Sequence, residues 1–286
     1  MTAKLNDAQS RLNSSVVDQV TTPTSLEDLQ DTVRLAETEN SIISIAGHMH
    51  SMGGQQFCDH SLHIDLRNFN RVLRFNTEKG HIEVESGIAW PALIEYLIKQ
   101  QNAEQDCWGI RQKQTGVDNV TIAGSLSSNI HGRGLNLPPF INDIESFTLI
   151  NADASIYTCS RTENTELFSL VVGGYGMFGI VAHVTLRLVP RIKIQRQVEV
   201  IAVRELIENI EARMREGALY GDCQYSIHVH EDISPHPGIF SYYVPVPDST
   251  TVADNQKQLN EDEWGKLYKL RVLTSRKHSR PIPGIT

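Results

Sequence analysis

The sequence lacks the cysteine pattern of a metal-binding or disulfide-stabilised protein. Its 286 residues include only four cysteines, Cys58, Cys107, Cys159 and Cys223, and none forms a C-x-x-C pair. Structural zinc sites usually contain closely spaced cysteine pairs, and disulfide-rich domains are usually secreted. The scattered cysteines therefore predict reduced thiols in a cytoplasmic protein without a metal site.

Long hydrophobic runs and an excess of positive charge are also missing. The most apolar region, residues 170–188, is interrupted by four glycines and by His183, whereas a membrane-spanning helix needs about 20 apolar residues. Residues 1–18 are polar and lack the apolar centre of a secretory signal. The net charge of -8 argues against nucleic-acid binding, which favours a basic face. We therefore expect no transmembrane segment and no nucleic-acid partner.

A glycine-rich stretch directly follows a strand pattern near the start of the chain. Residues 41–45 predict a strand, and residues 47–54 then contain three glycines, two histidines and a serine. Glycines allow backbone N–H groups to approach a ligand closely, and consecutive free N–H groups form a concave anion site. The stretch is either a cradle for a pyrophosphate, with an imidazole at its edge, or a glycine-rich surface turn.

Two further segments have the same character. Residues 109–134 are rich in Thr, Ser, Gly and Asn and contain no long apolar run. Because long loops without structure are uncommon unless they are functional, backbone laid along an extended polar ligand is favoured over a poorly ordered loop. Residues 174–179 have the G-x-G-x-x-G spacing, but a strand pattern follows them rather than a helix. A Rossmann assignment is therefore rejected.

Periodicity predicts a mixed chain of helices and strands. The sequence predicts a helix capped by Ser25 that ends near Thr38, a hairpin over residues 71–86, and a helix after Gly87 with Pro91 in its first turn. The other predicted elements are strands 42–45, 61–66, 144–151, 156–159, 180–189, 195–202, 225–230 and 239–246, and helices 162–168 and 205–215.

Four segments follow from these patterns. Residues 1–19 are predicted to be an N-terminal arm, mobile or folded as a short helix, and residues 20–191 a first domain that Pro190 closes. Residues 192–262 predict the start of an α+β domain. Residues 263–286 form a basic tail, which is either solvated or a contact for a partner or an anionic lipid.

The glycine-rich motifs, taken in order, resemble the PCMH-type FAD-binding domain of the vanillyl-alcohol oxidase and p-cresol methylhydroxylase superfamily. Residues 47–55 resemble its first pyrophosphate loop, and residues 63–72 resemble the strand that follows. Residues 116–124 resemble its G-x-x-x-x-T-I-G-G segment, and residues 129–132 match the sugar-oxidising and decaprenylphosphoryl-ribose oxidase branches. Residues 173–186 resemble the closing motif. The order and spacing together carry the resemblance, since each motif alone is weak.

The resemblance covers about residues 20–191 and implies an α+β fold: a PCMH-type FAD-binding domain of two α+β subdomains, followed by an incomplete α+β substrate domain. FAD would lie extended between the two subdomains. The residues that the resemblance assigns to FAD are Gly47, His48, Met49, His50, Ser51, Met52, Gly53, Gly54, Gln55, Thr115, Gly116, Val117, Val120, Gly124, Ser127, Ser128, Ile130, His131, Gly179 and Ile180.

His50 matches the histidine that bonds covalently to the flavin 8-methyl carbon in many members of this superfamily. The alternative is a loop histidine that forms hydrogen bonds beside a non-covalent FAD. His48 and Met49 replace two small residues that are usual at these positions, and His48 could compete with His50 for this role.

The implied activity is FAD-dependent oxidation of a CH–OH group, of sugar, alditol or sugar-lactone type, by hydride transfer to the flavin. A small-molecule alcohol would be the substrate, and oxygen or another acceptor would take the electrons. The catalytic base is not identified; His131, His228 and His230 are candidates, and the last two share one face of a predicted strand. The alternatives are a truncated, non-catalytic FAD-binding module without a complete substrate domain and a partner of another chain that supplies the missing half.

Overall fold

The computed structural model describes residues 2–101, 107–225 and 237–251, and the chain divides into two compact units. The N-terminal unit is Met1–Arg191 and the C-terminal unit is Ile192–Thr286. No helix in the part of the chain that the structure describes is long and apolar enough to cross a lipid bilayer.

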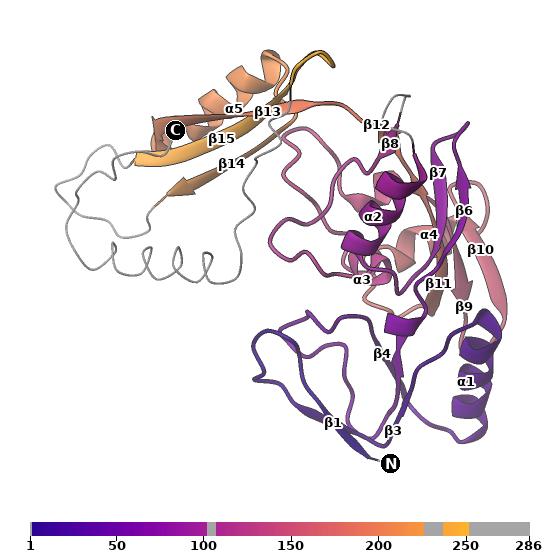
Figure 1. Ribbon diagram of the computed structural model, residues 1–286. Helices are drawn as coiled ribbons and strands as arrows, with labels where there is room; N and C mark the ends of the chain where they lie inside the picture. Colours follow the sequence, from indigo (N-terminus) through magenta and orange to yellow (C-terminus); the bar gives the residue numbers. More distant parts are fainter. Residues whose placement is uncertain (1, 102–106, 226–236, 252–286) are drawn as a thin grey trace. The chain divides into compact units, whose positions relative to one another are not determined.

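A small parallel sheet and one helix form the first half of the N-terminal unit (Figure 1). The strand order is β3–β5–β4, with β3 at Gln19–Thr21, β5 at Leu62–Asp65 and β4 at Ile43–Ala46. Helix α1 (Leu26–Thr38) connects β3 to β4. The Ser25 hydroxyl accepts the Asp28 N–H at 3.0 Å, which confirms the predicted N-cap. The apolar face of α1 packs against β5 in a second core, which also includes Ile150, Ile180 and Ala182 of the other half of this unit.

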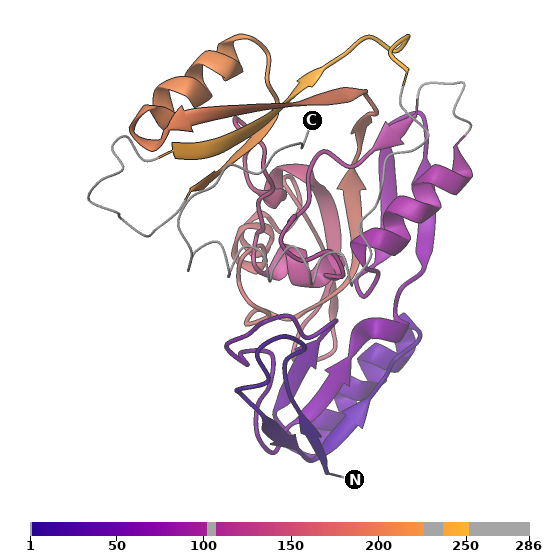
Figure 2. The same ribbon diagram turned by 60° about the vertical axis from the view of Figure 1, so that its left-hand side comes forward.

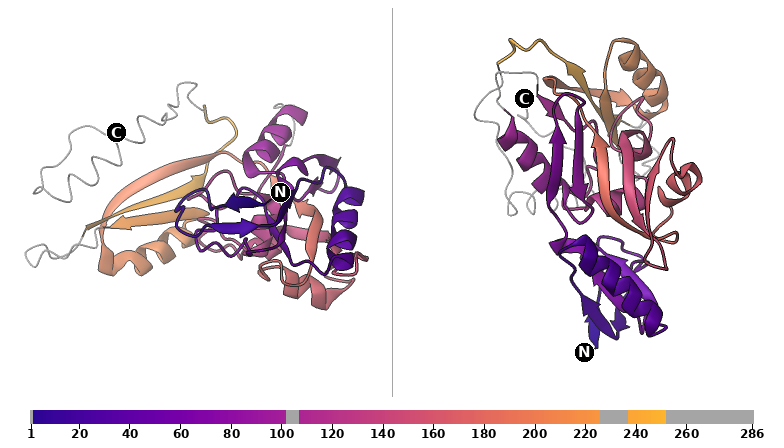
Figure 3. Two further views of the ribbon diagram at one scale, coloured as in Figure 1. Left: turned by 90° about the horizontal axis from the view of Figure 1, so that it is seen from below. Right: turned by 90° about the vertical axis from the view of Figure 1, so that its right-hand side faces the viewer.

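The second half of the N-terminal unit is a five-stranded antiparallel sheet (Figures 2 and 3). Its order is β10–β9–β11–β7–β6. The bounds are β6 Val72–Asn76, β7 His81–Glu85, β9 Ile144–Ile150, β10 Ile156–Ser160 and β11 Ile180–Arg187. β6 pairs with β7 in antiparallel register, which confirms the predicted hairpin. The strand that comes last along the chain, β11, lies at the centre of the sheet.

Three helices pack against the apolar face of this sheet. They are α2 (Trp90–Gln100), α3 (Ile122–Ser127) and α4 (Thr165–Val171), and their buried side chains share one core with those of the strands. Pro91 lies in the first turn of α2, as predicted. The buried Trp90 Nε1–H donates to Ser125 Oγ at 2.8 Å and ties α2 to α3. The remaining short elements are η1 (Leu66–Asn68), η2 (Phe140–Asp143) and the β8–β12 pair, Trp108–Gly109 with Val189–Pro190.

Residues 1–19, predicted to be an arm or a short helix, contain short strands and no helix. Residues Ala3–Leu5 (β1) pair antiparallel with Ser15–Val17 (β2), and β3 follows directly. The cause is the buried Asp7 carboxylate, which accepts hydrogen bonds from the backbone N–H groups of Gln9, Ser10 and Arg11. These bonds reverse the chain and bring the two short strands together.

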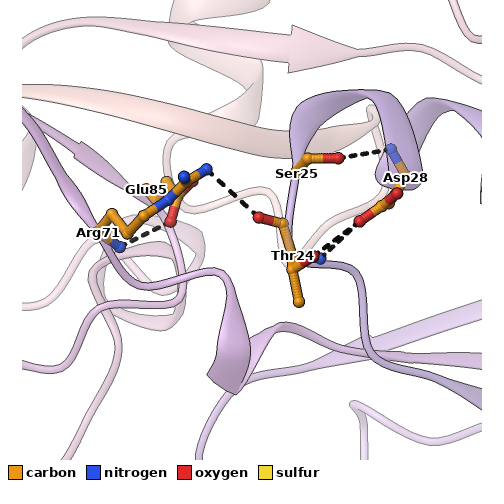
Figure 4. A network of polar contacts seen from close by, with 5 residues as sticks. All are labelled: Thr24, Ser25, Asp28, Arg71 and Glu85. Atoms are coloured by element: carbon orange, nitrogen blue, oxygen red, sulfur yellow. Dashed lines mark hydrogen bonds and ion pairs between the residues drawn. The ribbon is translucent and has the colours of Figure 1, made fainter.

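Buried Glu85 joins the two halves of the N-terminal unit (Figure 4). Its carboxylate accepts Arg71 Nε–H at 3.0 Å and Arg71 Nη2–H at 2.7 Å, and it also accepts the Arg71 backbone N–H at 2.6 Å. Arg71 Nη2–H also reaches the Thr24 carbonyl at 3.3 Å, and Thr24 in turn donates to Asp28 in α1. Because Glu85 is on β7 and Thr24 precedes α1, this network ties the five-stranded sheet to the small sheet.

The C-terminal unit contains a three-stranded antiparallel sheet with a helix (Figure 1). Its order is β13–β15–β14, and the bounds are β13 Ile194–Ala202, β15 Pro237–Pro245, β14 Tyr220–Tyr225 and α5 Leu206–Arg215, with η3 at Val203–Glu205. Arg213 of α5 lies over the ring of Tyr242, at 5.3 Å from the centroid, so α5 covers the face that buries Phe240 and Tyr242. Of the predicted strand 225–230, residues 226–230 lie outside the described residues, as does the predicted basic tail.

Gly87, next to Glu85, allows the two halves of the N-terminal unit to approach closely. A Cβ atom at Gly87 would lie 1.8 Å from the Leu66 carbonyl oxygen and 2.5 Å from that of Phe69. We therefore expect Gly87→Ala to lower the free energy of unfolding by about 3 kcal/mol, because backbone must move. Gly116→Ala is the matched control, since its Cβ meets nothing closer than 3.5 Å. Urea unfolding measures both, and equal stability of the two variants would contradict the close approach.

Candidate functional site

A cavity of about 460 Å³ lies in the N-terminal unit, bordered by its two larger sheets. Four segments line it: residues 43–51 from β4 and the first glycine-rich loop, residues 55–58, residues of 114–130, and residues of 171–181 around the third glycine-rich loop. The three glycine-rich segments of the sequence therefore meet around one space.

Most of the sequence-predicted cofactor residues line this cavity. They are Gly47, His48, Met49, His50, Ser51, Gln55, Val117, Val120, Gly124, Ser127, Ser128, Ile130, Gly179 and Ile180. Six others lie in the same segments without lining it: Met52, Gly53, Gly54, Thr115, Gly116 and His131. The structure thus brings residues of all three motifs to one cavity, whereas other residues of the same segments do not line it.

Several lining residues were missed because they either belong to no glycine-rich motif or occupy the non-glycine positions of one. Ile43 and Ile45 of β4, together with Tyr175 and Phe178, add apolar and aromatic surface. Gln56 also lines the cavity, and both polar atoms of its carboxamide are buried with no hydrogen-bond partner among the described residues. A polar ligand can supply that missing partner. The only signal in the sequence was the position of Gln56 immediately after the first loop.

Gly47 lets the first loop pass close to helix α3. A Cβ atom at Gly47 would lie 2.5 Å from both Cγ2 and Oγ1 of Thr121, the N-cap residue of α3. Only glycine fits without moving one of the two segments. We call the loop around Gly47 the cradle, since a glycine-rich loop can hold a ligand through backbone N–H groups rather than through basic side chains.

The imidazole rings of His48 and His50 lie beside the cradle and are nearly parallel. The ring centroids of His48 and His50 are 6.5 Å apart, with 23° between the planes. Asn119 Nδ2–H donates to His48 Nδ1 at 3.1 Å, which leaves the proton of the neutral ring on Nε2. Burial, assisted by the charge of Arg67, lowers the pKa of His48 and keeps this ring neutral at pH 7. The His50 Nδ1 atom lies 3.3 Å from Gln9 Nε2.

A buried chain of hydrogen bonds fixes the strand behind the cradle. The Ser61 hydroxyl donates to the Cys58 carbonyl at 2.6 Å, so the Ser44 hydroxyl donates to Ser61 at 2.7 Å and accepts from His63 Nδ1–H at 2.8 Å. His63 is fully buried, and burial lowers its pKa. The wall that Ser44 contributes to the cavity is therefore rigid and uncharged.

The histidines considered as a catalytic base do not converge on the cavity. His131 is exposed, its Nδ1 lies 3.0 Å from the Gly132 carbonyl oxygen, and it is not a lining residue. His228 and His230 lie outside the described residues. The described part of the chain therefore gives no structural support to any of the three as the base.

The segment 109–134 is neither extended throughout nor a plain loop, because it contains α3. It is anchored by the buried Gln112, whose Nε2–H donates to the Pro138 carbonyl at 2.6 Å while its Oε1 accepts the Gly132 N–H at 3.1 Å. Arg111 Nε lies 3.2 Å from Asp143 Oδ1. Burial raises the pKa of Asp143 to about 6, an effect that Arg111 and Arg187 only partly offset.

Comparison with known proteins identifies what this arrangement is similar to. A sequence model of the family described as FAD binding domain matches residues 17–160, half of the chain. L-gulonolactone oxidase of Bos taurus is 27% identical over 199 residues, which are 69% of this chain and 43% of that protein. D-arabinono-1,4-lactone oxidase of Debaryomyces hansenii is 26% identical over 200 residues, which are 65% of this chain and 34% of that protein.

A solved structure extends the similarity to the fold. Alkyldihydroxyacetonephosphate synthase aligns with a TM-score of 0.70 and 14% sequence identity, over 83% of this chain and 49% of that one. It has the PCMH-type FAD-binding fold, so the predicted fold class is confirmed. This chain spans less than half the length of the curated relatives described above.

The pKa of Asp143 makes stability depend on pH. Because the folded pKa, about 6, exceeds the ordinary value of 3.8, the carboxyl group stabilises the fold most below pH 3.8, and this contribution is lost as pH rises through 6. We expect Asp143→Asn to remove that loss, raising the free energy of unfolding relative to wild type by about 2–3 kcal/mol at pH 8 and by far less at pH 4.

Urea unfolding of both proteins from pH 4 to pH 8 measures this difference. The control is Asp153→Asn, since hydrogen bonds from Ser155 lower the pKa of that exposed carboxylate, and its contribution is lost only as pH falls below about 5. A stability difference between Asp143→Asn and wild type that stays constant over this pH range would show that the pKa of Asp143 is not raised in the folded protein.

Proposed function

The chain belongs to the FAD binding domain family, its cofactor is FAD, and from this membership we propose that it oxidises a CH–OH group of a sugar, an alditol or a sugar lactone. The observation that carries the proposal is the single cavity that the three glycine-rich segments line. The lactone oxidases among the relatives support the substrate class. Bound FAD would supply the redox chemistry by accepting a hydride from the carbinol carbon.

The residues of the cavity suit the parts of this cofactor. The cradle at Gly47 offers backbone N–H groups, which hold a diphosphate without lysine or arginine. Ile43, Ile45 and Phe178 offer apolar surface for ring systems. The neutral His48 presents Nε2–H as a further donor. The remaining predicted cofactor residues in residues 47–55, 115–131 and 179–180 are proposed as part of the same site.

Within this proposal, His50 is the residue placed for a covalent bond to the flavin. It lines the cavity beside the cradle, and its ring is held between His48 and Gln9. The Nδ1 atom faces Gln9, so the ring is oriented before any cofactor binds. Oxygen or another acceptor would take the electrons from the reduced flavin.

Purification and assay of the chain test the proposal. We expect a yellow protein that bleaches when sugars, alditols or aldonolactones are added under anaerobic conditions, and that releases hydrogen peroxide or reduces a dye in air. Acid precipitation separates the two roles of His50: a yellow pellet from wild type and a colourless one from His50→Ala supports the covalent bond, whereas a colourless wild-type pellet rejects it. A yellow protein inert to the whole substrate panel would leave an FAD-binding module without the proposed activity.

The cradle makes a separate prediction for Gly47. We expect Gly47→Ala to weaken FAD binding by at least 10-fold, about 1.4 kcal/mol, because its Cβ would separate the loop from Thr121. Gly109→Ala is the matched control, since the nearest contact of its Cβ is 3.8 Å away, at Arg191, and the residue lies outside the cavity lining. Flavin fluorescence titration of apo-protein measures both dissociation constants, and equal values would argue against the cradle.

A further inference from the structure

The short segment between β1 and β2 lies against the first glycine-rich loop. We call residues 7–13 the Asp7 turn. It precedes residue 17, where the match to the FAD binding domain begins, and no motif in the sequence pointed to it. Its contacts nevertheless fall on residues 49–54, the second half of the loop that borders the cavity.

The Asp7 turn is organised by one buried carboxylate. Besides the three backbone N–H groups described above, Asp7 accepts the Ser10 hydroxyl at 2.7 Å. Burial alone would raise the pKa of Asp7, but the hydrogen bonds from Ser10, Arg11 and Gln9 outweigh it and lower that pKa. Asp7 is therefore ionised at neutral pH, and the turn has a defined shape.

The turn binds the carbonyl oxygens of the loop. The Ala8 N–H donates to the Met49 carbonyl at 2.8 Å, and Asn13 Nδ2–H donates to the Met52 carbonyl at 2.7 Å. The Ser10 hydroxyl also reaches the Met52 carbonyl, at 3.3 Å. Gly54 has φ +72°, and a Cβ there would lie 2.8 Å from Asn13 Cβ, so the two segments are in direct contact.

These bonds decide where the next N–H groups point. In a trans peptide the C=O and the following N–H lie on opposite sides of the chain. Because the Met49 and Met52 carbonyls face the Asp7 turn, the N–H groups of His50 and Gly53 face away from it. Neither of these two groups donates to an acceptor among the described residues. Met49 has φ +58°, a left-handed conformation that a non-glycine residue keeps only when its surroundings hold it there.

We propose that the Asp7 turn is a positioning element of the cofactor site. It holds the loop by its carbonyls, which presents the N–H group of His50, a lining residue of the cavity, to the diphosphate of FAD. Gln9 extends the same contact to the His50 ring at 3.3 Å. This inference rests on the proposed FAD site and adds to it a segment that lies before the family domain.

Ligands with and without a diphosphate separate positioning from general stability. Apo-protein from riboflavin-starved cells would be titrated with FAD, ADP and riboflavin. We expect Asp7→Ala to weaken FAD and ADP at least 10-fold and Asn13→Ala about 3- to 10-fold, the loss of one hydrogen bond to the loop, while riboflavin binding stays at the wild-type value. Asp7→Asn should recover part of the loss, because an amide oxygen can still accept some of the backbone bonds.

Leu12→Ala is the matched control, since Leu12 lies in the same turn with its side chain 83% exposed. Amide hydrogen exchange gives a second readout: ADP should slow exchange at the His50 N–H in wild type and in Leu12→Ala, and much less in Asp7→Ala. Equal ADP and FAD affinities in wild type, Asp7→Ala and Asn13→Ala would overturn the positioning role and leave the FAD site standing. A parallel loss of riboflavin affinity would also overturn it, and wild type that binds neither FAD nor ADP would overturn both proposals.

Discussion

The contact between the two halves of the N-terminal unit is the constraint on which the candidate site depends. Glu85 is almost fully buried and would be strongly unfavourable there without Arg71, whose Nε–H and Nη2–H both donate to Glu85 Oε1. The same guanidinium continues to the Thr24 carbonyl. Gly87, which has no side chain, allows the backbone there to lie close to the carbonyl oxygens of Leu66 and Phe69. Residues of both halves line the cavity, so the shape of the cavity depends on the geometry of this contact.

Sequence periodicity was sufficient for the elements whose pattern is local. Helix α1 and its Ser25 cap, the β6–β7 hairpin and the start of α2 at Pro91 all follow from residues within one turn or one loop of each other. The strands β1 and β2 were not predictable in that way. Three residues each form them, and they exist because the Asp7 carboxylate reverses the chain between them.

The same distinction applies to the candidate site. Glycine-rich loops can be recognised in a sequence because a close backbone approach excludes side chains, as at Gly47 beside Thr121. The apolar wall from Ile43 and Ile45 could not be assigned, because these residues look like any buried strand until the sheet brings them to the cavity. α3 was missed for a related reason: it is short, rich in Ser and Gly, and held by the Thr121 cap and by Trp90 rather than by helix propensity.

The central place of β11 has a consequence for how the chain acquires its fold during synthesis on the ribosome. Until residues 180–187 emerge, β6–β7 and β9–β10 are separate hairpins, each with an unpaired edge that β11 later joins on both sides. Such edges pair readily with other chains. The nascent protein is therefore most prone to aggregation just before its sheet can close, and a stop between β10 and β11 would release two hairpins with unpaired edges instead of a smaller folded domain.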